Sequence, residues 1–186
     1  MRITPIDVLA DLFDIDRGRA EEIIRAIEKE VKALPKNTTL ADYRKKMDRF
    51  VKENYKGKEF WFAISLVVGD VIVLHPELLT TTVWHDAVEI TLGFIIAPYV
   101  TPEGTTGRVD DKTVKEIFGK NIEELRDVIE RVYDKFVKDE SVEMADIKEM
   151  FDDDIEKFIV AVAFHIWIAF ELLKKKVLPV PQTSPA

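Results

Sequence analysis

Two helix-length stretches that are apolar on almost every side constrain this chain more than any other feature. From Phe158 to Leu173 the only polar residues are His165 and Glu171. From Phe60 to Leu74 the only charged residue is Asp70. A helix that is apolar all round lies either in the middle of a helical bundle or across a membrane.

The length and flanks of the later stretch favour burial within a bundle. Residues 158–173 fall short of the roughly 20 apolar residues that a bilayer core requires, and the enclosed histidine makes insertion more costly. Acidic residues 152–154 precede the stretch and basic residues 174–176 follow it, as suits the dipole of an ordinary helix. We therefore expect no membrane association. The first 13 residues contain no signal-peptide core, which favours the cytoplasm.

The composition excludes several classes of site. Of the 186 residues, 47% are hydrophobic, which is enough for a real core. The chain has no cysteine, so disulfides, thiol catalysis and cysteine-ligated zinc or iron–sulfur sites are excluded. The net charge of −8 disfavours general affinity for nucleic acids, because surplus negative charge repels phosphates.

Amphipathic segments recur in the same order in the two halves of the chain. Residues 21–34 align without a gap to residues 123–136, and residues 40–51 align without a gap to residues 144–155. The apolar positions stay in register, and the two apolar stretches then follow at equivalent places. Three matched segments in one order indicate an internal duplication.

The sequence therefore predicts an all-α fold, an internally duplicated helical bundle. Two homologous four-helix halves would pack with pseudo-twofold symmetry, because three short amphipathic neighbours cannot cover an apolar helix alone. The first half spans residues 1–97 and includes one additional helix over about 82–97. Residues 98–111 form a linker rich in proline and glycine, residues 112–177 form the second half, and residues 178–186 form a tail.

One alternative concerns strands within the two apolar stretches. Residues 67–74 and 159–168 are rich in β-branched side chains, and periodicity alone does not distinguish a short buried strand from a buried helix. The length of the runs and their place in the repeat favour helices, less clearly for residues 67–74, which include Gly69.

The polar residues inside the apolar stretches are the first candidate site. In the repeat alignment Asp70 lies one turn after the position equivalent to His165, so helices that cross near Gly69 would bring carboxylate and imidazole together. A buried charge needs a partner, and a glycine permits close approach of two backbones. A structural pair, a catalytic or ligand-binding pair, and two groups that reach water separately all remain open.

The second candidate is a metal site. His85 and Glu89 are four residues apart and would share one face of a helix, so both could bind a divalent metal ion. His75 and Glu77, in the preceding turn, would complete the ligand set of a metal-dependent enzyme. The alternative is that these residues belong to a solvated helix face, in which case no cofactor is expected.

The third candidate is a stripe of basic side chains in an otherwise acidic chain. Its members recur at helical spacing, and three further basic residues lie near it in the sequence. The basic stripe consists of Lys45, Arg49, Lys52 and Lys56, with Arg44, Lys46 and Lys58 nearby.

The second half of the chain reverses the charge of this stripe. Glu149 aligns with Lys45 and Asp153 aligns with Arg49, followed by Asp154; these three carboxylates are named the acidic cluster. The stripe and the cluster would lie on equivalent third helices and could pair within one molecule or between molecules. They could also be unrelated solvated faces, and the stripe could bind phosphate or nucleic acid.

No nucleophile–base pair, phosphate-binding loop or multi-histidine motif stands out in the sequence. We therefore expect a non-enzymatic helical interaction or scaffold protein, with a protein partner or a second copy of itself as ligand. Self-association would use the basic stripe and the acidic cluster. The alternatives are a metal-dependent enzyme with a site within residues 75–89 and a nucleic-acid accessory protein that uses residues 44–58.

Overall fold

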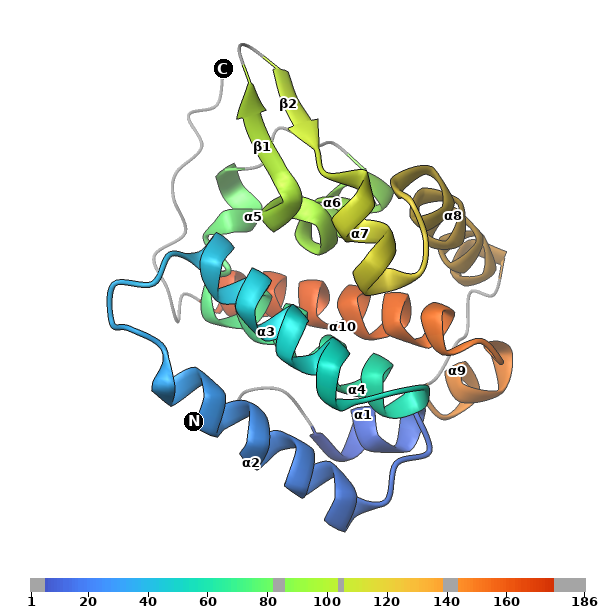
Figure 1. The fold of residues 1–186 in the computed structure, drawn as a ribbon. Helices are drawn as coiled ribbons and strands as arrows, with labels where there is room; N and C mark the ends of the chain where they lie inside the picture. Colours follow the sequence, from blue (N-terminus) through green and yellow to red (C-terminus); the bar gives the residue numbers. More distant parts are fainter. Residues whose placement is uncertain (1–5, 82–85, 104–105, 139–143, 176–186) are drawn as a thin grey trace.

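The computed structural model describes residues 6–81, 86–103, 106–138 and 144–175. In these parts helices dominate, and the strands form one small hairpin (Figure 1). The fold is therefore all-α, as the sequence predicts. The elements are α1 (Ile6–Leu12), α2 (Arg17–Ala33), α3 (Leu40–Asn54), α4 (Lys58–Leu74), α5 (Leu78–Thr81), α6 (Ala87–Ile96), the 3₁₀ helix η1 (Ala97–Tyr99), β1 (Val100–Glu103), β2 (Thr106–Val109), α7 (Asp111–Phe118), α8 (Ile122–Lys138), α9 (Met144–Met150) and α10 (Asp154–Lys174).

The two apolar stretches form α4 and α10, which pack against each other at the centre of the molecule (Figure 1). The helices run in the same direction, because the rings of Trp61 and Phe158 lie 5.4 Å apart near their starts and Gly69 meets His165 further along. Every residue of α4 from 62 to 69 is buried. Complete burial of one large apolar side chain contributes about 1.5–3 kcal/mol, so this helix pair supplies much of the core.

Both stretches are helical throughout, including residues 67–74, so the strand alternative is wrong for them. Not all of α10 is enclosed by the described parts of the chain, since Trp167 and Phe170 expose 57% and 42% of their surface. Among the described helices none combines the length and the apolar character that crossing a bilayer would need.

The internal duplication stays a prediction. The helices expected to be the third of each half differ in length. The first-half helix α3 has 15 residues, whereas its expected counterpart α9 has 7 and ends at Met150. Residues 152–154 are three consecutive aspartates, which disfavour a helix interior and favour the start of the next helix. Asp153 is accordingly the N-cap residue of α10.

The segment expected to be a linker, residues 98–111, contains an antiparallel hairpin. Val100 pairs with Val109, and Glu103 pairs with Thr106. Threonine and valine on both sides of the turn favour extended backbone. Pro102 and Gly107, which suggested a linker, lie in the two strands, whereas Pro98 belongs to η1.

The additional helix is shorter than expected. It was predicted to span about 82–97, whereas α6 begins at Ala87 after Asp86, whose carboxylate accepts a hydrogen bond of 2.8 Å from the Glu89 amide. Residues 82–85 and the predicted tail, 178–186, lie outside the described residues.

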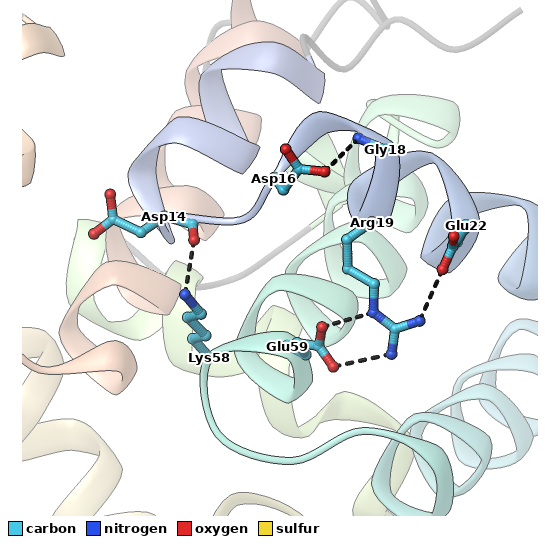
Figure 2. Close-up of polar contacts among 7 residues, drawn as sticks. All are labelled: Asp14, Asp16, Gly18, Arg19, Glu22, Lys58 and Glu59. Carbon is cyan, nitrogen blue, oxygen red and sulfur yellow. Dashed lines mark hydrogen bonds and ion pairs between the residues drawn. The ribbon is translucent and has the colours of Figure 1, made fainter.

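Polar contacts tie the start of α2 to the start of α4 (Figure 2). The Arg19 guanidinium donates two hydrogen bonds of 2.7 and 3.0 Å to Glu59, and a third of 3.1 Å to Glu22. These bonds hold the pKa of Glu59 below its usual range. The Lys58 ammonium donates to the Asp14 carbonyl at 2.8 Å. Lys58, which lies near the basic stripe in sequence, therefore stabilises the contact between the start of α4 and the segment before α2.

Candidate functional site

Helix α3 divides its side chains between the core and solvent. Its N-cap residue is Thr39, whose hydroxyl accepts a hydrogen bond of 3.2 Å from the Asp42 amide. Met47 and Val51 are fully buried, and Lys45 on the outer side is exposed. This division gives α3 an exposed polar face that carries most of the basic stripe.

The four residues of the basic stripe are exposed, but they have different surroundings. Arg49 lies 3.7 Å from the Glu116 carboxylate on α7. The Lys52 ammonium lies 5.1 Å from the centre of the Phe60 ring, a cation–π contact. Within the described parts of the chain, Lys45 and Lys56 have no ion-pair partner. Two of the four charges are therefore available for an external partner.

Arg44 does not belong with the stripe, because it is buried in a polar network. Its guanidinium donates to both carboxylate oxygens of Asp48, at 3.2 and 3.0 Å. It also donates to the carbonyls of Phe94 and Ile95, at 2.6 and 2.9 Å. The Tyr99 hydroxyl donates to Asp48 at 2.5 Å. The network therefore joins α3 to the end of α6 and to η1.

The buried network satisfies both charges through hydrogen bonds, as a buried ion pair requires. Burial, together with the negative charge of Asp48, raises the pKa of Tyr99 far above its usual range, so this hydroxyl stays protonated and remains a donor. The sequence contains a signal for this network: Arg44 and Asp48 are spaced i,i+4 on the same helical face as Met47 and Val51.

A cleft of about 570 Å³ lies beside the network, between α3, the start of the hairpin and α7. Lys45, Lys46 and Arg49 contribute its positive charge, and the aromatic residues Phe50 and Tyr99 contribute to its lining. The volume is within the range of roughly 300–1,000 Å³ that is typical of small-molecule sites. Two residues of the basic stripe therefore belong to a concave surface.

One carboxylate in this cleft has a structural role. Asp110 caps α7 and accepts hydrogen bonds from the Thr113 hydroxyl and amide at 2.7 and 3.2 Å. These bonds hold the pKa of Asp110 below its usual range, and the charge of Lys45 contributes to the same shift. The Asp110 carboxylate is thus engaged in capping α7.

The alignment predicted that the acidic cluster lies on a single helix, but the structure divides its three residues between α9 and the start of α10. Glu149 lies on α9, whereas Asp153 precedes α10 and Asp154 is its first residue. Glu149 and Asp153 are exposed, and none of the three has an ion-pair partner among the described residues. In Figure 1, α9 lies at the right edge of the molecule and α3 crosses its front.

The structure brings His165 to Gly69, the neighbour of Asp70. His165 is fully buried, and its Nδ1 lies 2.6 Å from the Ala161 carbonyl, to which a neutral imidazole donates. Burial lowers the pKa of His165 to about 4, although the hydrogen bond to Ala161 opposes this shift. Asp70 is half-buried. A bond between the Asp70 carboxylate and the His165 ring stays a prediction.

The predicted metal ligands are only partly described. The Nδ1 atom of His75 lies 3.1 Å from the Glu77 carboxylate, and Glu89 lies 3.2 Å from Arg126 on α8. His85 falls outside the described residues. Over the described ranges, no three His, Asp or Glu side chains group as a possible metal site. A metal site that includes His85 stays untested.

Comparison of the chain with family models, with curated proteins and with solved structures gave no match. Function must therefore be inferred from the geometry of the chain itself.

Proposed function

We propose that this protein is a non-enzymatic interaction module that self-associates through its basic stripe and its acidic cluster. The observation that carries the proposal is that two surfaces of opposite charge are exposed and keep charges without an ion-pair partner in the described parts of the chain. Lys45 and Lys56 are such charges on the stripe, and Glu149 and Asp153 are such charges in the cluster.

The opposite charges of these two exposed surfaces favour contacts between molecules. Because the stripe and the cluster carry opposite charge, the stripe of one copy can face the cluster of another in a head-to-tail arrangement. Each exposed ion pair contributes only about 0.2–1 kcal/mol. The charges would therefore determine orientation and the rate of encounter more than affinity.

The use of the stripe for nucleic acid has less support. Arg49 and Lys52 already contact groups of the same chain, and Arg44 is buried. The neighbouring aromatic residues Phe50 and Tyr55 are partly or fully buried, so they do not form a stacking surface for bases.

Light scattering at low and high ionic strength tests the proposal. At about 20 mM salt we expect a mass above that of the monomer, and at about 500 mM salt we expect the monomer, because salt screens exposed charges. Lys32, an exposed residue of α2 outside the stripe, gives a matched control. Lys56→Glu should lower the low-salt mass and Lys32→Glu should not. A monomer under both conditions would exclude self-association.

A further inference from the structure

The cleft between α3 and α7 contains groups that the proposed self-association does not use. Lys46 lies in the cleft but outside the basic stripe, and Glu30 and Glu53 line it as well. Helix α3, which supplies the largest share of the lining, packs against α2, η1 and α7. The cleft is therefore a concave site with its own set of charges.

The cations of the cleft suit a phosphate group. Lys45 and Lys46 have no ion-pair partner among the described residues. Arg49 lies 3.7 Å from Glu116, which is long for a hydrogen-bonded pair, so its guanidinium can turn toward a ligand. Two lysine ammonium groups beside a planar guanidinium, which donates several hydrogen bonds, form a common arrangement for binding phosphate oxygens.

The carboxylates of the cleft suit hydroxyl groups on the same ligand. Asp110 is held by Thr113, whereas Glu30 and Glu53 are exposed. A carboxylate accepts hydrogen bonds and would repel a second anion. These two residues therefore favour a ligand that carries hydrogen-bond donors in addition to its phosphate. The apolar residues Phe50 and Ile117 give the lining a surface for carbon atoms.

We propose that the cleft binds a small phosphorylated ligand that also carries hydroxyl groups, with the phosphate at Lys45, Lys46 and Arg49 and the hydroxyls at Glu30 and Glu53. A sugar phosphate and a nucleotide share this chemistry. A ligand in the cleft would cover Lys45 and Arg49, so its binding would compete with self-association. Lys46 belongs to the cleft alone, and Lys56 belongs to the stripe alone.

Isothermal titration calorimetry at low salt tests this site. We expect saturable one-to-one binding of ribose 5-phosphate or adenosine monophosphate, weaker binding of inorganic phosphate and no binding of ribose. Tighter binding of the nucleotide would indicate that the base also contacts the cleft, and equal binding would indicate that the sugar phosphate is the part recognised. Absence of saturable binding by both phosphorylated probes would overturn the proposal.

Matched variants separate this site from self-association. Lys46→Gln should lower the affinity for the phosphorylated probe by roughly tenfold, because one charge-assisted contact is lost. It should leave the low-salt mass unchanged. Lys56→Gln should lower that mass and leave probe binding unchanged. If both variants weakened probe binding equally, the result would contradict a cleft site, because it would show that the probe is attracted by the overall charge of the surface.

Discussion

Gly69 of α4 and His165 of α10 pack so closely that position 69 has no room for a side chain. A Cβ atom built on Gly69 would lie 2.4 Å from His165 Nε2 and 2.5 Å from two ring carbons. Real Cβ atoms do not approach other heavy atoms to such distances. The pairing of the two central helices therefore depends on a glycine in one helix facing an imidazole in the other.

Gly69→Ala should destabilise the protein by about 2 kcal/mol, because the added methyl group forces a well-packed ring to move. Chemical denaturation measures the loss. The control is a double-mutant cycle with His165→Ala, which opens the space that the methyl group requires. We expect the double variant to be more stable than the sum of the single effects predicts, by more than about 1 kcal/mol. Additive effects would mean that the two residues do not constrain each other.

Stability should fall as the pH is lowered from about 6.5 toward 4. The pKa of His165 is lowered to about 4 by burial, from an ordinary value of 6.5. Between these values the unfolded chain binds a proton on His165 and the folded chain does not, so acid favours unfolding. The full shift corresponds to about 3 kcal/mol. Urea denaturation at several pH values measures the slope.

Other groups also titrate in this range, so the comparison is with His165→Leu, which lacks the imidazole. The variant should have a shallower dependence on pH between 4 and 6.5 than the wild type. Identical slopes would show that His165 is protonated to the same degree in the folded and the unfolded chain.

Asp48→Asn should cost about 3–5 kcal/mol of unfolding free energy, because it leaves the Arg44 guanidinium buried beside a neutral partner. Tyr99→Phe, which removes one donor to the same carboxylate, should cost about 1–2 kcal/mol. The control is Glu59→Gln in the Arg19 contact shown in Figure 2, whose side chains are 42% and 30% exposed. Solvent screens that pair, so its loss should stay below about 1 kcal/mol. Similar losses at Asp48 and Glu59 would contradict the difference in burial.

The central helices could be predicted from the sequence because their signals are local. The residues Gly57 and Pro76 bound the first apolar stretch, and the aspartates before Asp154 mark the start of the second. Helices α4 and α10 contain the two apolar stretches and begin a few residues before them, at Lys58 and Asp154. Apolar character over such lengths leaves few arrangements other than mutual burial.

Features that depend on contacts between distant residues were harder to predict. The hairpin requires Val100 to pair with Val109, and the proline and glycine near its turn resemble a linker equally well. The burial of Arg44 depends on the carbonyls of Phe94 and Ile95, which lie some fifty residues away in the chain. Charged residues are rarely buried without such partners, so composition suggested a solvated stripe.

The most direct test of self-association mixes two variants of opposite charge. One carries Lys45→Glu, Lys52→Glu and Lys56→Glu, so both of its surfaces are acidic. The other carries Glu149→Lys and Asp153→Lys, so both of its surfaces are basic.

Each variant alone should be a monomer at low salt, because like charges face each other in a head-to-tail contact. An equimolar mixture should regain a mass above the monomer, since an acidic surface of one variant then meets a basic surface of the other. Light scattering of the two variants and of their mixture gives the result. Association of either variant alone, or a mixture that stays monomeric while the wild type associates, would contradict pairing of the basic stripe with the acidic cluster.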